Sequence, residues 1–274
     1  MYICAHCFLL NAYMPTDPLL LQERHALILQ RLQTDGRVLA PDLAQWLQVS
    51  EDTIRRDLRD LAAAGLCQKV YGGALRMPLP AAPGGTPAQR RAAQTGRKAH
   101  LAAAAVPCVT PGSVVFIDAG STNLAVAAAL GEHRLTVITN APAVAAALID
   151  KPLIELIVIG GRIHAETGAS IGATALRELE LISPDLYILG ACGVDAQAGV
   201  SAIHFEEAEF KRHVASLSKT VLVATTNDKV GTAAPYAVLE AASVSVLVGE
   251  HDIDVRQADA FAARGVRVLR AAKP

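Results

Sequence analysis

The chain has 274 residues, of which 52% are hydrophobic, and its formal net charge is −1. This length suits two folded domains. The near-zero charge excludes a protein that coats nucleic acid over its whole surface, but it is compatible with a local basic face. No apolar run reaches the roughly 18 residues needed to span a membrane, and the five scattered cysteines give no disulfide framework. We therefore expect a cytoplasmic protein with no membrane partner.

Three residues near the N-terminus have side chains that can bind metals. Cys4, His6 and Cys7 lie close together but lack a second pair of ligands, so we predict no metal site there. The same segment has no basic stretch before its short apolar run, which argues against a signal peptide. Met14 is an alternative start, so the predicted domains begin after residue 13.

Three short helices are predicted next. An apolar pattern of helical spacing covers residues 19–34, and Pro41 begins a second, shorter helix. Ser50 is a suitable N-cap for a third helix at residues 51–64. The buried side of this third helix is formed by three residues spaced i, i+4 and i+7, namely Ile54, Leu58 and Leu61.

A small hairpin is predicted after the third helix. Residues 66–70 and 73–76 are two extended pieces around a turn at Tyr71-Gly72-Gly73. Two helices joined by a tight turn and followed by a hairpin are typical of a winged helix-turn-helix. We therefore predict a DNA-binding domain of this type at residues 19–76.

The third helix presents an outward face suited to DNA. When its apolar side faces the core, Arg56 and Arg59 point outward, with Thr53 and Arg55 on the flanks. The planar fork of arginine can bond two guanine acceptors or clamp a phosphate. The alternative is that these arginines only pair with carboxylates of the same solvated helix.

A basic stretch follows this helix. From Leu61 to Ile117 the sequence has no Asp or Glu. This favours contact with phosphates, and a solvated linker is the alternative. The basic residues of the stretch are Lys69, Arg76, Arg90, Arg91, Arg97 and Lys98.

Residues 77–94 are predicted as a linker, because they are rich in proline and glycine and have no apolar period. Over residues 95–274, β-branched runs alternate with Ala-rich helices, which indicates a mostly parallel α/β sheet covered on both faces. The predicted strands are residues 114–117, 135–138, 154–159, 186–189, 221–224 and 244–248. Helices are predicted through residues 124–130, 142–149, 174–181 and 206–217.

The loop from Asp118 to Thr122 has the components of a phosphate cradle. It follows a strand and opens a helix, so Gly120 permits close approach and the helix presents free N–H groups beside two hydroxyls. An ordinary strand-to-helix loop with a Ser or Thr cap is the alternative. The carboxyl ends of parallel strands share one sheet edge, so three other loops are expected there: Thr139-Asn140, Gly160-Gly161-Arg162 and Gly190 to Asp195. Lys211 and Lys229 would add positive charge, unless they are ordinary surface lysines.

The N-terminal motifs resemble the DNA-binding signature of the DeoR family of bacterial transcriptional repressors. The resemblance is carried by the run from Val49 to Leu58, by Leu61, Gly65 and Leu66, and by Tyr71 to Ala74. It implies that the third helix carries Thr53, Arg55 and Arg56 to an operator and that Gly72 and Gly73 shape the wing. The candidate DNA-binding residues are therefore Ser50, Thr53, Arg55, Arg56, Arg59, Lys69, Gly72 and Gly73.

The C-terminal motifs resemble the effector domain of the same family. They are Asp118 to Thr122, Ile138 to Asn140, Gly160-Gly161, Gly190 to Asp195, and Lys211-Arg212. The resemblance implies a fold similar to ribose-5-phosphate isomerase and a phosphorylated sugar as effector. By this resemblance Asp118 and Asp195 would bond sugar hydroxyls, while Gly120, Ser121, Thr122 and Lys229 would hold the phosphate. The candidate effector-binding residues are therefore Asp118, Gly120, Ser121, Thr122, Asn140, Gly160, Gly161, Asp195, Lys211 and Lys229.

One stretch departs from the family pattern. Members usually carry an Asp three residues before a lysine that is followed, two positions on, by a glycine. Here Thr226 stands where that Asp is expected, although Lys229 and Gly231 hold their places. The departure bears on the identity of the effector.

We expect a transcription regulator of carbohydrate-metabolism genes, acting as a repressor and forming a homo-oligomer on double-stranded operator DNA. No catalytic residue and no cofactor are predicted. The main alternative is a sugar-phosphate isomerase-like enzyme fused to a DNA-binding head, for which Glu206, Glu207 or Glu209 would be the candidate base. A third alternative, an architectural protein without an effector, leaves the series of loops unexplained.

Overall fold

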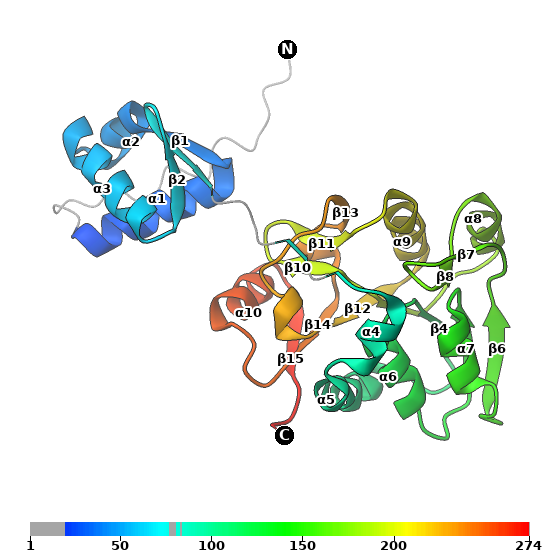
Figure 1. Cartoon of the computed structure of the whole chain (residues 1–274). Coiled ribbons are helices and arrows are strands. Elements are labelled where there is room, and N and C mark those ends of the chain that lie inside the picture. The colour runs from blue at the N-terminus through cyan, green and yellow to red at the C-terminus, as the bar shows by residue number, and fades with distance from the viewer. Residues whose placement is uncertain (1–19, 77–80, 83, 274) are drawn as a thin grey trace, which may run out of the picture. The chain divides into compact units, whose positions relative to one another are not determined.

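The computed structural model describes residues 20–76, 81–82 and 84–273. The chain divides into two compact units, with the boundary at residues 78 and 79 (Figure 1). The predicted absence of metal at Cys4, His6 and Cys7 concerns residues outside the described ranges. Within those ranges, no helix combines the length and the apolar character needed to cross a membrane.

The N-terminal unit is a winged helix-turn-helix, as predicted. Its three helices pack on a three-stranded antiparallel sheet with the order β1-β3-β2, and the core includes Ile28, Leu32 and Leu58. Strand β1, which the sequence analysis did not predict, pairs with β3. The elements are α1 (Leu21–Asp35), β1 (Arg37–Leu39), α2 (Ala40–Leu47), α3 (Glu51–Ala63), β2 (Cys67–Val70) and β3 (Gly73–Arg76).

Local chemistry sets the ends of these helices. Gly36 ends α1 with a left-handed φ of 72°, and Pro41 occupies the first turn of α2. The hydroxyl of Ser50 accepts a hydrogen bond from the Thr53 amide at 3.2 Å, which caps the N-terminus of α3. The roles of Pro41 and Ser50 were predicted from the sequence.

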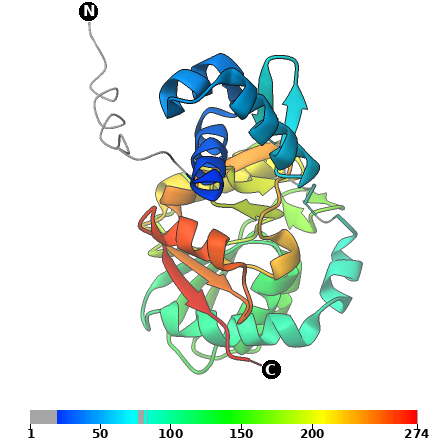
Figure 2. The same ribbon diagram turned by 90° about the vertical axis from the view of Figure 1, so that its left-hand side faces the viewer.

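The C-terminal unit is built around a seven-stranded parallel sheet with the order β15-β14-β12-β9-β4-β5-β6. This confirms the predicted mostly parallel α/β domain. The strands are β4 (Val114–Ile117), β5 (Leu135–Thr139), β6 (Ile154–Val158), β9 (Leu186–Leu189), β12 (Thr220–Ala224), β14 (Val246–Gly249) and β15 (Arg267–Arg270). In Figure 2 the red β15 lies in front.

Helices cover both faces of this sheet because successive strand residues point to opposite sides. Phe116 contributes to one apolar cluster with α8, α9 and α10, whereas its neighbours Val115 and Ile117 contribute to another with α5, α6 and α7. The helices are α5 (Thr95–Ala105), α6 (Ser121–Ala129), α7 (Pro142–Leu148), α8 (Ala173–Leu179), α9 (Phe205–Leu217) and α10 (Val255–Ala262).

Smaller elements lie outside the seven-stranded sheet, and the sequence analysis did not predict them. Strands β10, β11 and β13 form an antiparallel sheet, and β7 pairs with β8. They are β7 (Ile163–His164), β8 (Ala169–Ser170), β10 (Gly193–Asp195), β11 (Gly199–Ala202) and β13 (Tyr236–Leu239), with short 3-10 turns η2 (Val106–Cys108), η3 (Asn227–Lys229) and η4 (Ala241–Ser243).

Part of the predicted linker is structured. Helix α4 (Pro87–Ala92) lies inside residues 77–94 and contacts α6, and Ala81 forms a bridge with Ala233. Thr86 caps α4 through its hydroxyl, and Gln89 returns a bond to the Thr86 amide. The expectation of an irregular linker was therefore wrong for residues 87–92. This helix has no apolar period, and it is stabilised instead by its capping box and by packing on α6.

Candidate functional site

Helix α3 exposes the arginines that were predicted to read DNA. Ile54, Leu58 and Leu61 are buried, and Arg55, Arg56 and Arg59 are exposed. The Arg55 guanidinium lies 2.8 Å from Glu51 and 3.9 Å from Asp52, as the alternative interpretation proposed. These pairs are solvent-exposed, so they stabilise the helix by roughly 0.3–0.5 kcal/mol each and leave Arg55 free to change partners.

The other predicted DNA-binding residues fall into two groups. Ser50 and Thr53 form the cap of α3, with their hydroxyl oxygens 2.8 Å apart. Lys69 is exposed on β2, and Gly72 lies in the wing turn with a left-handed φ of 80°. All four lie on the same small unit as the α3 arginines.

Gly73, which was expected to shape the wing, does so through a contact with β1 that the sequence analysis did not predict. It is buried where β1 crosses β3, and a Cβ added there would lie 2.0 Å from the carbonyl oxygen of Val38. The close approach of β1 therefore requires a glycine at this position. This burial explains the glycine by packing within the wing, and a contact of Gly73 with DNA stays a prediction.

Asp57 anchors α3 to α1. Its carboxylate accepts two hydrogen bonds from the Arg24 guanidinium, at 2.5 and 2.9 Å, and lies 3.3 Å from His25. Asp57 is buried, and the hydrogen bond to its carboxylate raises the pKa of Arg24 despite partial burial. Its position, three residues after Ile54 and four before Leu61, was the available sequence signal for a buried partner.

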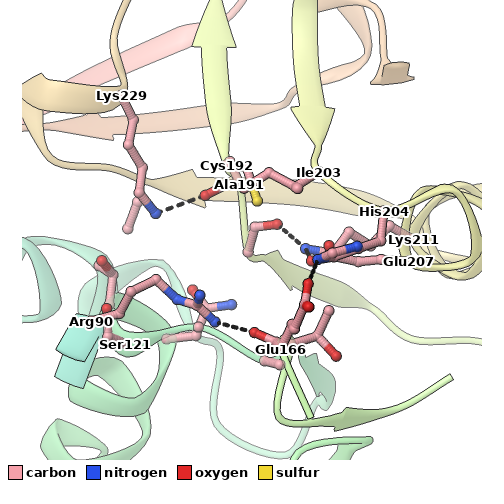
Figure 3. Close-up of a pocket in the computed structure, with 17 residues that line it drawn as sticks. Arg90, Ser121, Glu166, Ala191, Cys192, Ile203, His204, Glu207, Lys211 and Lys229 are labelled. Carbon is pink, nitrogen blue, oxygen red and sulfur yellow. Dashed lines mark hydrogen bonds and ion pairs between the residues drawn. The ribbon is translucent and has the colours of Figure 1, made fainter. Parts of the chain in front are cut away.

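The C-terminal unit has a pocket at the carboxyl edge of the sheet, between the loops after β4, β9 and β12 (Figure 3). It encloses about 610 Å³ of space, part of which is open solvent. Predicted and unpredicted residues line it together. They include Arg90, Gly120, Ser121, Thr122, Glu166, Cys192, His204, Glu207, Lys211 and Lys229.

The predicted phosphate cradle forms one side of this pocket. Helix α6 begins at Ser121 behind Gly120, and the first intrahelical bond runs from the Leu124 amide to the Gly120 carbonyl. The amides of the first turn therefore lack acceptors within the helix. Together with the hydroxyls of Ser121 and Thr122 they favour an anion.

Lys229 lies on the opposite side of the pocket. Its Nζ donates a hydrogen bond to the carbonyl of Ala191 at 2.8 Å (Figure 3). Burial lowers the pKa of this ammonium more than the neighbouring Cys192 and Asp228 raise it. An anion in the pocket would stabilise the charged form of Lys229.

A buried group of charges lies behind the cradle. The Lys211 ammonium is 3.1 Å from Asp118 and 2.8 Å from Glu207, and Tyr187 donates a hydrogen bond to Asp118 at 3.2 Å. Burial lowers the pKa of Lys211, but the two carboxylates outweigh it and the net pKa is raised. Burial raises the pKa of Asp118 in spite of Lys211.

This arrangement changes the roles predicted for two residues. Lys211 neutralises two carboxylates, and its Nζ also donates to the Gly190 carbonyl. Asp118 accepts hydrogen bonds from the amides of Ala119 and Gly190 and is 1% exposed. Both residues hold the β4 and β9 loops together, so the pocket rests on their ion pair.

Four further predicted residues do not line this pocket. Asp195 accepts hydrogen bonds from the amides of Gln197 and Ala198, and from the side chain of Gln257 at 2.8 Å. Asn140 donates to the Ser170 carbonyl, and the Gly160 amide donates to Glu178, next to Gly161. Asn140 follows β5, the two glycines follow β6 and Asp195 is the last residue of β10, whereas the cradle lies after β4.

The position that departs from the family pattern is also outside the pocket lining. Thr226 is 1% exposed and directly precedes the 3-10 turn η3, whose last residue is Lys229. The Lys229 amide bonds to the Thr226 carbonyl at 3.0 Å. Thr226 therefore acts on the site through the backbone that positions Lys229.

Sequence reasoning missed several pocket residues. The Arg90 guanidinium donates to the Glu166 carbonyl at 3.0 Å, and the Glu166 carboxylate lies 3.0 Å from Nε2 of His204. His204 is also in ring contact with His164 at 4.8 Å between centroids. Glu166 and His204 lie in loops, which have no apolar periodicity. Arg90 lies in α4, and its only sequence signal was its place in the basic stretch.

Two family descriptions match the sequence, and together they cover both units. "DeoR-like helix-turn-helix domain" matches residues 24–77, and "DeoR C terminal sensor domain" matches residues 93–251. The chain belongs to the DeoR family. Its curated relatives include a glycerol-3-phosphate regulon repressor of Escherichia coli strain K12, which is 33% identical over 76% of this chain and 82% of the relative.

Other relatives of this DeoR-family chain span nearly its whole length. A putative aga operon transcriptional repressor of Escherichia coli O157:H7 is 28% identical over 90% of this chain and 93% of the relative. Among solved structures, ribose 5-phosphate isomerase A from Methanocaldococcus jannaschii is 16% identical, with a TM-score of 0.38 over 50% of this chain and 55% of that one.

Proposed function

We propose that this DeoR-family protein is a DNA-binding transcriptional repressor of carbohydrate-metabolism genes and that a phosphorylated sugar controls it. One observation carries the proposal. The chain that presents exposed arginines on a recognition helix also forms a pocket in which the N-terminus of α6 and Lys229 face the same space. The relatives named as a putative aga operon transcriptional repressor and as a glycerol-3-phosphate regulon repressor support the same function.

DNA binding is assigned to α3 and the wing. The exposed Arg56 and Arg59 would reach base edges or phosphates in the major groove, and Lys69 would contact the backbone beside the wing. We propose that the protein binds as a homo-oligomer, a dimer or a dimer of dimers, which would place two recognition helices on a repeated or palindromic operator.

Effector binding is assigned to the pocket. The phosphate would lie against the first turn of α6, where the amides and the hydroxyls of Ser121 and Thr122 donate to its oxygens. Lys229 would neutralise part of the charge. The sugar would extend toward Glu166 and His204, whose polar atoms line the remaining space.

The charges in the pocket support a sensor and not an isomerase. An isomerase needs a carboxylate base whose pKa is tuned toward the working pH. Burial raises the pKa of Glu207, but the attraction of Lys211 outweighs it and the net pKa is lowered. Glu206 and Glu209 do not line the pocket. We therefore propose that the protein has no catalytic activity.

Thermal unfolding with a panel of sugar phosphates, each beside its unphosphorylated parent, tests the effector assignment. A ligand present at 100 times its dissociation constant adds about 2.7 kcal/mol to the stability of the folded state. We expect the melting temperature to rise with one phosphorylated sugar and not with its parent. Equal shifts with both members of a pair, or no shift across the panel, would contradict the phosphate-reading pocket.

Selection of bound sequences from a random double-stranded DNA pool tests the DNA-binding assignment. We expect a repeated or palindromic sequence to be enriched, and the bound fraction to fall when the effector found in the panel is added. Recovery of unrelated sequences would favour the architectural alternative. Turnover of the bound sugar phosphate, followed by proton NMR, would favour the isomerase.

A further inference from the structure

Helix α4 connects the effector pocket to the chain that leads to the DNA-binding unit. Both of its ends are held. Thr86 caps the N-terminus, and the Lys98 ammonium of α5 donates to the carbonyls of Arg90 and Ala93 at the C-terminus. An added Cβ at Gly168 would lie 3.5 Å from Pro87, so the β7-β8 loop also packs against the first turn.

The side chain of Arg90 points from this helix into the pocket (Figure 3). Its guanidinium donates to two backbone carbonyls, that of Gly85 in its own segment and that of Glu166 across the pocket. Within the described ranges no carboxylate forms an ion pair with Arg90. The nearby carboxylates are already paired, Glu166 with His204 and Glu207 with Lys211.

A guanidinium held only by neutral carbonyls is poised to accept a stronger partner. Arginine binds a phosphate through two parallel charge-assisted bonds, which are roughly twice as strong as bonds between neutral groups. The carbonyl of Gly85 can be given up at low cost, because it is exposed to water. The cradle residues Gly120 and Ser121 line both hollows to which Arg90 contributes.

We propose that Arg90 binds the effector phosphate together with the first turn of α6, and that this exchange of partners transmits binding to the DNA-binding unit. This inference rests on the proposed function. When the guanidinium turns to the phosphate it releases the Gly85 carbonyl, and the segment before α4 loses one of its fixed points. The ligand thereby favours one arrangement of the connecting segment over the other, which is the condition for coupling two sites.

The proposal requires a phosphate ester dianion as the ligand, because the charge of the phosphate is what outcompetes the carbonyls. It also separates two roles in the pocket. Lys229 and Ser121 contribute affinity only, whereas Arg90 contributes both affinity and coupling. Arg90→Lys keeps the positive charge but loses the planar, two-pronged guanidinium, so it tests the role in coupling more sharply than the role in affinity.

Isothermal titration calorimetry measures ligand affinity for four proteins: wild type, Arg90→Gln, Arg90→Lys and Arg264→Gln. The ligands are the sugar phosphate found in the panel and, as a simpler probe, inorganic phosphate. Arg264, which follows α10, is the matched control, because its exposed guanidinium donates to the Ala260 carbonyl and does not line the pocket. Operator affinity is then measured with and without saturating ligand. We expect Arg90→Gln to weaken phosphate binding about tenfold or more, and Arg90→Lys to lose most of the ligand effect on operator affinity while retaining part of the binding.

The outcomes distinguish the inference from the function on which it rests. If wild type binds neither a sugar phosphate nor inorganic phosphate, both are overturned. If wild type responds and Arg90→Gln responds equally in affinity and coupling, only the role of Arg90 is overturned. If binding falls but the coupling at saturation is unchanged in both variants, the transmission step is wrong. Melting curves that match wild type without ligand show that the variants are folded.

Discussion

The Arg24 guanidinium and the Asp57 carboxylate form a two-pronged ion pair that fastens the recognition helix to α1, with N–O distances of 2.5 and 2.9 Å. The side chains are 12% and 2% exposed. Removing Arg24 would leave a buried carboxylate without its cation, which costs more than the pair contributes. The orientation of α3 therefore depends on a residue outside the helix-turn-helix itself.

We expect Arg24→Ala to lower the stability of the N-terminal unit by about 3 kcal/mol. The only tryptophan of the chain, Trp46, lies in α2, so urea unfolding followed by tryptophan fluorescence reports on this unit alone. Asp35→Ala is the matched control, because it breaks an exposed pair with Arg31 and should cost less than about 1 kcal/mol. Equal costs for the two variants would contradict the anchoring role of Asp57.

Arg56→Ala is expected to weaken operator binding by about 1–3 kcal/mol, or about 5- to 150-fold, if the side chain contacts a base. Fluorescence anisotropy with a labelled operator measures the effect over a series of salt concentrations. A loss that is uniform across sequences would instead indicate a phosphate contact. The affinity for the sugar phosphate should not change, and loss of both activities would contradict the separation of the two units.

Gly73 and Gly72 are neighbours for which different outcomes are expected. Gly73→Ala places a Cβ against the Val38 carbonyl, so we expect it to destabilise the N-terminal unit by about 2 kcal/mol or more through overpacking. Gly72→Ala has open space but a φ of 80°, and should cost about 1 kcal/mol from backbone strain alone. Trp46 fluorescence in urea measures both, and a larger cost for Gly72→Ala would refute the β1 contact as the cause.

Lys211→Met leaves Asp118 and Glu207 buried without a cation, and we expect the C-terminal unit to lose about 3–5 kcal/mol at neutral pH. Circular dichroism during urea unfolding measures the loss. Burial already raises the pKa of Asp118, so in the variant the folded state binds protons more readily than the unfolded chain. Its stability should therefore rise as the pH falls from about 8 to about 5.

Adding Glu207→Gln to Lys211→Met serves as the control for this charge group. The second change removes one of the uncompensated carboxylates, so part of the stability should return. A Lys211→Met protein as stable as wild type, or a double variant less stable than the single one, would show that the ion pairs do not support the pocket.

The secondary structure could be predicted where periodicity and capping agree. Ser50 at the start of α3 and the β-branched run of Val114 to Ile117 both have the conformation that their local chemistry favours. Strand β1 and the antiparallel strands β10, β11 and β13 could not be predicted in this way. Each has only three or four residues, which is too few for a period, and β1 and β11 also pair with strands that are distant in the sequence.

The candidate site was predicted in part, for a similar reason. Ser121 and Thr122 follow a strand directly, so their place at the sheet edge is fixed by local sequence. Asp195 is the last residue of β10, which belongs to the small antiparallel sheet, and its carboxylate accepts a hydrogen bond from Gln257 of α10. Arg90 enters the pocket from a helix that no apolar period marks, and its role depends on tertiary packing.

The shortness of α4 has a consequence for how coupling can be observed. A helix of six residues does not persist alone in water, so α4 exists only while Thr86 and Lys98 hold its ends against the C-terminal unit. The amide of Arg90 bonds to the Thr86 carbonyl and that of Ala93 to the Gln89 carbonyl. The rate of hydrogen–deuterium exchange at these two amides therefore reports how often α4 separates from the C-terminal unit, and it can be measured in the intact protein.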